Sequence, residues 1–194
     1  NYMLNPISSY AKHKAEIEKY LIAQKNKVDY SVTILRFATA FGLSPRMRFD
    51  LTINHFTRAV MQDKTLKIYD PDTWRPYCHV TDFARLIESV LISKKDKTHF
   101  KIFNAGSDKN NFTKRQIIEE IAKIIPTRKI SFLKGDSDPR NYRVNFSKVK
   151  ETLNFDTELS VQTGIKEIHE AIKSNYFKGE NTELKELGNF KIKK

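Results

Sequence analysis

The stretch SSYAKHKAEIEKYLIAQKNKVDYSVTILRF, residues 8–37, joins a helical pattern to a strand pattern and so indicates the fold class. Apolar residues recur at helical spacing after Ser8 or Ser9, either of which can cap the first turn, and we expect a helix to about Gln24. Residues 30–37 are rich in β-branched and aromatic side chains, which predicts a buried strand. A helix followed by such a strand favours an α/β protein.

The remaining sequence continues this alternation of helices and strands. Thr113 and Gln116 have the spacing of a capping box, and Thr81 is suited to cap another helix. The pattern predicts helices over 51–61, 82–92, 114–125, a short stretch after Ser147 and 161–174, strands over 66–69, 101–106 and 129–133, and loops or turns over 38–46 and 70–76. These short strands and helices predict a mixed α/β lobe in the C-terminal two thirds.

Composition limits the classes of protein to which the chain can belong. Its 194 residues suffice for one domain, or for one domain with a small lobe. Because it has one cysteine, no basic-then-apolar leader and no apolar run near the ~20 residues of a membrane span, we expect a cytoplasmic protein without membrane contact. The net charge of +12 favours anionic ligands such as phosphates, nucleotides or nucleic acid.

Tyr10 and Lys14 lie four residues apart within the first predicted helix, so their side chains share one face. A tyrosine hydroxyl ionises near pH 10, so it can act as a base near neutrality only where positive charge stabilises the phenolate. Lys14, or a bound nicotinamide ring, can supply that charge. The alternative is an exposed polar pair, because a chain with eight tyrosines and many lysines contains such a spacing by chance.

Five ordered segments carry a resemblance to a known family: SSYAKHKAEIEKYL, ILRFATAFGLSPRMRFD, TLKIYDPDTWRPYCHVTDFARLI, FNAGSDKNNFTKRQI and DSDPRNYRVNFSKVKETLNF. Together they resemble the extended short-chain dehydrogenase/reductases that act on nucleotide sugars, in the epimerase/dehydratase branch, over residues 5–172. The resemblance implies an NAD-dependent enzyme that transiently oxidises a sugar hydroxyl of an NDP-sugar. It also implies the end of a Rossmann-type parallel sheet, a mixed α/β substrate-binding lobe and a homodimeric full-length protein.

The resemblance assigns the catalytic and cofactor-binding roles to two segments. Tyr10 would be the general base, and Lys14 would hold the nicotinamide ribose and stabilise the phenolate. Phe37, Ala38 and Thr39 would form the loop that contacts the nicotinamide and the sugar diphosphate, with Thr39 standing where many relatives have asparagine.

Further residues are implied to bind the substrate diphosphate. Asn54, at the start of a predicted helix, would reach it, and the guanidinium groups of Arg75 and Arg140 would grip its oxygens, since a guanidinium pairs with phosphate bidentately. His79 and Asp82 suggest a dyad or a metal ligand pair, but HVTDFA is typical of a strand end followed by a helix cap, so we interpret both as structural. No histidine and cysteine spacing in the sequence predicts a metal site.

A glycine-rich dinucleotide-binding turn is absent from the sequence, because its six glycines form no such fingerprint. We therefore expect a truncated, inactive piece of an enzyme whose NAD is bound mainly by an N-terminal half. Within it, 1–50 would belong to the Rossmann-type domain with the catalytic helix, 51–177 to the nucleotide-sugar lobe and 178–194 to a charged tail. The alternative function is a basic nucleotide- or nucleic-acid-binding module without catalysis, although no RNA- or DNA-binding motif is present.

Overall fold

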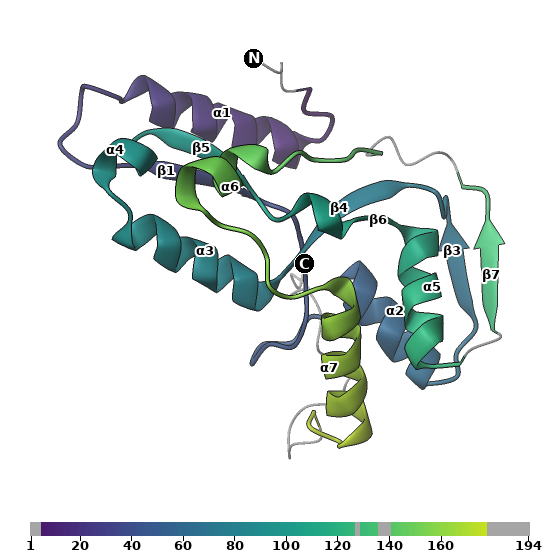
Figure 1. Ribbon diagram of the computed structural model, residues 1–194. Coiled ribbons are helices and arrows are strands. Elements are labelled where there is room, and N and C mark those ends of the chain that lie inside the picture. Colours follow the sequence, from purple (N-terminus) through teal and green to yellow (C-terminus); the bar gives the residue numbers. More distant parts are fainter. Residues whose placement is uncertain (1–4, 127–128, 136–140, 178–194) are drawn as a thin grey trace, which may run out of the picture.

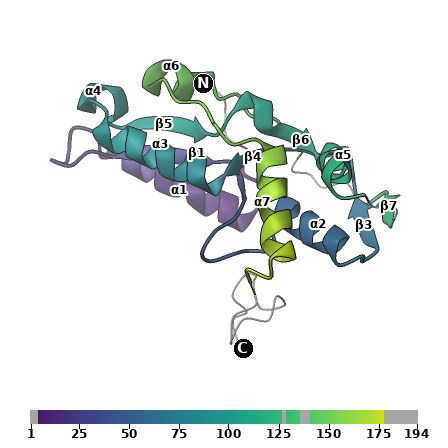
Figure 2. The same ribbon diagram turned by 60° about the horizontal axis from the view of Figure 1, so that its bottom comes forward.

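A parallel pair of strands between two helices forms one side of the molecule (Figure 1). The computed structural model describes residues 5–126, 129–135 and 141–177. Strand β1 (Thr33–Phe37) pairs in parallel with β5 (Lys101–Ala105), and helices α1 (Ser9–Ala23) and α3 (Val80–Ile92) lie on opposite faces of the pair (Figures 1 and 2). This layering of helices on a parallel sheet confirms the predicted α/β class.

The other side of the molecule is a lobe of short strands in mixed directions. Strand β4 (Trp74–His79) lies between β2 (Thr39–Phe41), to which it is parallel, and β6 (Asn111–Thr113), to which it is antiparallel. Strands β3 (Leu66–Tyr69) and β7 (Ile130–Leu133) form a separate parallel pair. The predicted mixed α/β lobe is therefore present.

Three amphipathic helices cover this lobe: α2 (Thr52–Met61), α5 (Lys114–Ile124) and α7 (Val161–Lys173). Their apolar faces meet β2, β3 and β4 in the largest core cluster, which includes Phe41, Ile53, Ile68, Tyr77, Ile117, Ile121 and Ile165. A second cluster joins α3, β5 and α6 (Ser147–Leu153). The shorter α4 (Lys95–Thr98) and a 3₁₀ turn over Asp108–Asn110 complete the described elements.

Most predicted elements are confirmed, and four local predictions are wrong. The sequence predicts a buried strand over 30–37, but β1 begins at Thr33 and none of its residues is buried. The capping box of Thr113 and Gln116 is present in full. Residues 38–46 were expected as a loop and 70–76 as a turn, but β2 and β4 begin inside them, because pairing along one ladder stabilises short strands that propensity alone does not favour. Helix α3 begins at Val80, where the ring of His79 rather than Thr81 accepts the capping hydrogen bond.

A tightly packed junction joins β2, β4 and α7. The buried ring of His79 accepts a hydrogen bond from the Thr81 backbone N–H at 3.2 Å through Nδ1, so its Nε2–H donates to Glu167 Oε2 at 2.7 Å. Gly42 has φ +103° and lies against this ring, where an added Cβ would stand 2.0 Å from Nε2. Only a glycine tolerates both that backbone conformation and that approach.

Two carboxylates tie the segment after α6 to the rest of the fold. Asp82 on α3 is fully buried and accepts hydrogen bonds from the backbone N–H groups of Glu158 and Leu159, at 3.1 and 3.0 Å, and from Arg85. Burial acts to raise the pKa of Asp156, but hydrogen bonds from Ser107 and two lysines outweigh it and lower that pKa to about 2.

No helix in the described part of the chain is long and apolar enough to span a bilayer. Strand β5, from the second predicted domain, pairs with β1 of the first. The limits at residues 50 and 177 stay predictions, and the predicted tail over 178–194 lies outside the described residues.

Candidate functional site

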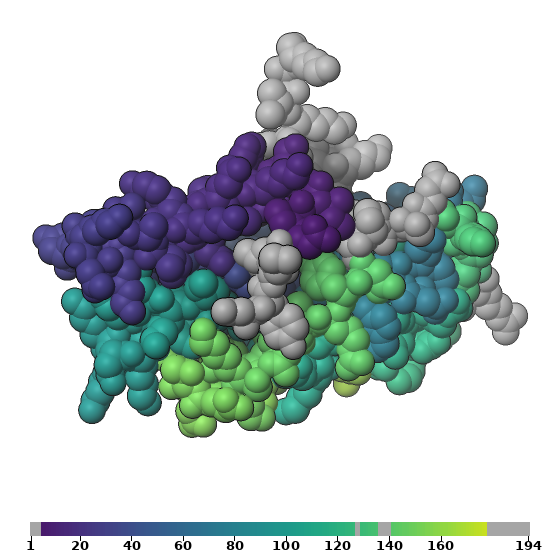
Figure 3. All heavy atoms as spheres, turned by 90° about the horizontal axis from the view of Figure 1, so that it is seen from above, coloured from purple at the N-terminus to yellow at the C-terminus, as the bar shows by residue number. Residues whose placement is uncertain are grey.

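Tyr10 and Lys14 form the predicted pair on the first turns of α1. The Lys14 ammonium lies 5.6 Å from the centroid of the Tyr10 ring, and Tyr10 is 72% exposed. Eight residues further along the helix, Glu18 binds Arg36 of β1 through two hydrogen bonds. At 1.5 Å per residue, Tyr10 therefore lies about 12 Å from Glu18 along the helix axis, at the end of α1 that points toward the mixed lobe (Figure 3).

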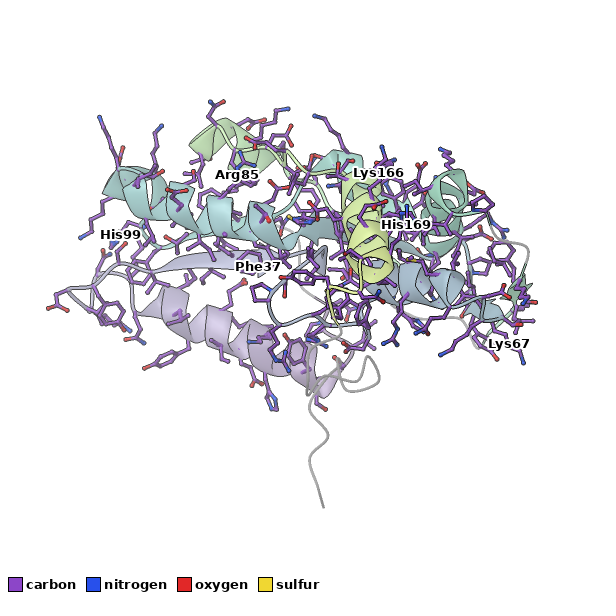
Figure 4. The ribbon with its side chains drawn as sticks, turned by 90° about the horizontal axis from the view of Figure 1, so that it is seen from below. Phe37, Lys67, Arg85, His99, Lys166 and His169 are labelled. Carbon is purple, nitrogen blue, oxygen red and sulfur yellow. The ribbon has the colours of Figure 1, made fainter. Side chains whose placement is uncertain are left out.

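The segment from Phe37 to Thr39 connects the β1–β5 sheet directly to the β2–β4–β6 sheet and is not the loop that the sequence predicted. Phe37 ends β1 between α1 and α3, with its ring 4.3 Å from that of Phe83 (Figure 4). Ala38 donates its N–H to Ala105 at 3.1 Å, and Thr39 begins β2. Phe37 is 44% exposed and Thr39 half-buried, so contact of either with a cofactor or substrate stays a prediction.

Asn54 lies in the first turn of α2, where both polar atoms of its side chain bind backbone groups. Its Oδ1 accepts the Gly42 N–H at 3.1 Å and its Nδ2 donates to the Arg48 carbonyl at 3.0 Å. The side chain is 2% exposed. In this structure Asn54 therefore fixes the segment between Gly42 and Arg48 against α2, and its predicted contact with a diphosphate stays a prediction.

The start of α2 has the properties of an anion-binding site. Its N-cap is Leu51, whose side chain makes no capping hydrogen bond, and its first turn contains no acidic residue. The N–H groups of a first helical turn have no partner within the helix and carry partial positive charge, so they favour anions. Thr52 adds a hydroxyl at the first helical position.

Tyr77 of β4 brings a buried hydroxyl to the same place. Its oxygen makes no hydrogen bond of regular geometry, and burial raises the pKa of Tyr77 to about 12, against smaller lowering effects of the Thr52 hydroxyl and Arg75. The Tyr77 hydroxyl thus lies near the Thr52 hydroxyl, and the charge of Arg75 also acts on it. A neutral phenol, a hydroxyl and a guanidinium beside a helix N-terminus form a donor set suited to phosphate oxygens.

Arg75 is the predicted diphosphate ligand that the structure brings to this group. It lies two residues before Tyr77 on β4, so the two side chains share one face of the strand. Its Nη1 donates to the Trp74 carbonyl at 2.7 Å, and its guanidinium lies 5.3 Å from the centroid of the Tyr142 ring. The second predicted arginine, Arg140, lies outside the described residues.

A groove of about 480 Å³ opens beside the start of β4. Its walls include Thr73, two residues before Arg75, and Asn141, whose Oδ1 accepts the Trp74 N–H at 2.9 Å. Phe132 and Arg115 also line it, with the guanidinium 4.4 Å from the ring centroid. This volume lies in the usual range for small-molecule sites.

Other titratable residues have structural roles. His79 and Asp82 are buried, and their hydrogen bonds go to the cap of α3, to α7 and to the segment after α6, so the interpretation of both as structural is confirmed. Burial raises the pKa of the Cys78 thiol, which makes this residue a poor nucleophile. Within the described ranges no three His, Cys, Asp or Glu side chains group as metal ligands.

Sequence reasoning missed two members of the site at α2. Thr52 could have been found as the polar residue at the start of a helix that lacks a polar cap. Tyr77 had no sequence signal, because its environment depends on how β4 packs under α2.

Comparison with curated proteins links the chain to nucleotide-sugar enzymes. It is 27% identical to the UDP-glucuronate 4-epimerase of Thermodesulfobacterium geofontis over 164 residues, which are 83% of this chain and 49% of that enzyme. UDP-glucuronic acid decarboxylase 1 of Arabidopsis thaliana is 26% identical over 170 residues, 84% of this chain and 38% of the relative. The chain thus spans about half or less of the length of these relatives.

Solved structures show the same fold. A UDP-glucuronic acid 4-epimerase variant from Bacillus cereus, in complex with a fluorinated UDP-sugar and NAD, superposes with a TM-score of 0.78 at 24% identity, covering 91% of this chain and 56% of the other. The dTDP-glucose 4,6-dehydratase of Bacillus anthracis, in complex with NAD, gives 0.76 at 22% identity, covering 90% and 55%.

The family assignment follows from the sequence match over the first half of the chain. A sequence profile matches residues 1–106, which include the Tyr10 and Lys14 pair, the β1 and β5 strands and Arg75. The match favours an enzyme family over the nucleic-acid-binding alternative. The chain belongs to the NAD dependent epimerase/dehydratase family.

Proposed function

We propose that this chain provides the catalytic tyrosine and most of the nucleotide-sugar lobe of an NAD-dependent epimerase or dehydratase. The observation that carries the proposal is the convergence of Arg75, Tyr77 and Thr52 at the uncapped N-terminus of α2. That donor set suits a pyrophosphate, which is the group that all NDP-sugars share. Both relatives described above act, by their names, on UDP-glucuronate or UDP-glucuronic acid.

Tyr10 and Lys14 supply the acid and base chemistry in this proposal. With the Lys14 ammonium 5.6 Å from its ring, the Tyr10 phenolate takes the proton from a sugar hydroxyl, and the same phenol later returns a proton to the reduced sugar. NAD, when bound, would supply the hydride acceptor and donor for the carbon that bears this hydroxyl. Return of the hydride to the opposite face of the keto sugar would yield an epimer. Loss of water before that return would yield a dehydrated sugar.

The residues present fit only the nicotinamide end of NAD. Lys14 projects from the same helical face as Tyr10, where it would hold the nicotinamide ribose. The sequence contains no glycine-rich turn to hold the dinucleotide pyrophosphate. We therefore assign most NAD contacts to a part of the enzyme outside this sequence, and propose that this piece alone is inactive and that the full-length enzyme is a cytoplasmic homodimer.

The substrate would lie along one face of β4. Side chains two residues apart on a strand are about 7 Å apart, so Thr73, Arg75 and Tyr77 form a row. With the pyrophosphate at Arg75 and Tyr77, the nucleoside would extend past Thr73 into the groove lined by Phe132 and Asn141. The sugar would extend in the other direction, toward the end of α1 that carries Tyr10.

Titration of the 194-residue chain with UDP in a calorimeter tests this proposal. We expect UDP to bind, and Arg75→Ala to weaken binding by about 2 kcal/mol, roughly 30-fold, because charge-assisted hydrogen bonds are lost. Lys123→Ala is the control, since this cation pairs with Glu120 on the surface of α5. Equal affinities for the two variants, or no binding by the unmodified chain, would overturn the assignment.

A further inference from the structure

Two pairs of neighbouring residues from distant parts of the chain contact one another through cation–π interactions. The guanidinium of Arg75 lies 5.3 Å from the ring centroid of Tyr142, and that of Arg143 lies 4.7 Å from the ring of Trp74. Each arginine therefore contacts the aromatic ring that neighbours the other arginine in sequence. We call the two contacts among residues 74, 75, 142 and 143 the crossed contacts.

Hydrogen bonds of the backbone fix the two segments that carry the crossed contacts. The Trp74 N–H donates to Asn141 Oδ1 at 2.9 Å, and the Tyr142 N–H donates to the Trp74 carbonyl at 3.4 Å. Val144, the residue after Arg143, exchanges two hydrogen bonds with the side chain of Asn111, at 3.0 and 3.1 Å. The segment around Tyr142 is thus held along the start of β4.

This arrangement determines how the Arg75 side chain lies. The Arg75 guanidinium lies over the Tyr142 ring, and the Trp74 carbonyl accepts from Nη1 at 2.7 Å. Stacking uses the face of a guanidinium, whereas its N–H donors lie in the plane, so a stacked arginine keeps the geometry needed for bidentate pairing with phosphate. Fixing the side chain before binding also reduces the entropy that is lost on binding.

We infer that Tyr142 is a positioning residue, which holds the Arg75 guanidinium in the orientation that binds the substrate pyrophosphate. The inference rests on the proposed function and assigns a role to a residue that would act through Arg75. The contact between Trp74 and Arg143 also helps to position Arg75, because it holds the segment that carries Tyr142 against β4.

The test compares UDP and inorganic pyrophosphate binding to five variants of the chain by calorimetry. Tyr142→Leu removes the ring, and we expect both ligands to bind about two- to fivefold more weakly, the effect of losing one partly exposed cation–π contact. Tyr142→Phe keeps the ring and should keep the affinity. Tyr176→Leu is the matched control, since Tyr176 is 63% exposed, follows α7 and has its ring against that of Phe177. In an Arg75→Ala background, Tyr142→Leu should have no further effect.

The outcomes separate this inference from the proposed function. If UDP binds and Arg75→Ala weakens it, but Tyr142→Leu matches Tyr176→Leu, Tyr142 has no positioning role. An equal loss with Arg75 present or absent would also refute the inference, because Tyr142 would then act on the ligand directly or through general stability. If the unmodified chain binds neither ligand, the proposed function fails and the inference fails with it.

Discussion

Replacement of Gly164 by alanine tests the packing that holds α7 against the mixed lobe. Gly164 lies inside α7, where alanine is normally more stable than glycine by about 1 kcal/mol. Helix propensity alone thus predicts a gain in the free energy of unfolding. In this structure, however, the added Cβ would stand 2.5 and 2.6 Å from two carbons of the Phe41 ring.

Those distances decide the sign of the effect. Carbon atoms in contact lie about 3.5–4.0 Å apart, so the Phe41 ring or α7 must move by about 1 Å. The ring is fully buried and lies edge-on to His79 at 5.3 Å, and His79 is bound to Glu167. Overpacking of this kind costs about 1–3 kcal/mol, which offsets or exceeds the propensity gain, so we expect a net loss of up to about 2 kcal/mol.

Urea unfolding followed by circular dichroism measures this change. The midpoint for Gly164→Ala should fall with an unchanged slope. Phe41→Leu provides the companion variant: it should lower stability alone, but the two substitutions together should cost less than the sum of their separate effects, because leucine vacates the ring positions. A raised midpoint for Gly164→Ala, or strict additivity of the pair, would refute the packing argument.

Three further predictions concern catalysis and charge. In the full-length enzyme, Tyr10→Phe should abolish turnover in a steady-state assay while the affinity for the nucleotide sugar is nearly unchanged; retained turnover would exclude Tyr10 as the base. Asp82→Asn should lower the free energy of unfolding by about 2–3 kcal/mol in urea, because an amide group would face backbone donors in a buried site, and an unchanged midpoint would contradict this. Since the pKa of Asp156 is lowered to about 2, its stabilisation is present above pH 4 and is lost as the pH falls toward 2. Asp156→Asn should thus cost about 1 kcal/mol at pH 7, after allowance for solvent screening, and progressively less below pH 4; a difference independent of pH would show that the charge does not stabilise the fold.

The elements that the sequence predicted well are those with strong local signals. The helix after Ser8 and the capping box at Thr113 follow from side chains that bond to their own helix, so no tertiary information is needed. Strand β4 depends on pairing with β2 and β6, partners that lie more than 30 residues away in sequence. The local sequence therefore predicts a turn at its start, because the proline and the acidic residues there dominate the pattern.

Some residues of the candidate site could likewise be predicted from local sequence, whereas others depend on tertiary packing. The spacing of Tyr10 and Lys14 within one helix made their shared face predictable, and Arg75 came from the resemblance to a family. Tyr77 and Thr52 could not be found from sequence, because their proximity results from the packing of β4 beneath α2. Asn54 shows the opposite case: its type and place suggested a ligand contact, whereas its amide binds two backbone groups.

The central claim is that a pyrophosphate binds at the N-terminus of α2 beside β4. Two-dimensional ¹H–¹⁵N NMR spectra of the chain during titration with UDP test it most directly, because the backbone amides of Thr52 and Ile53 would donate to the phosphates. The account predicts that the largest shift changes occur at residues 52–54 and 75–77, and that Arg75→Ala reduces them at equal UDP concentration. Changes centred elsewhere, or none at saturating UDP, would contradict it.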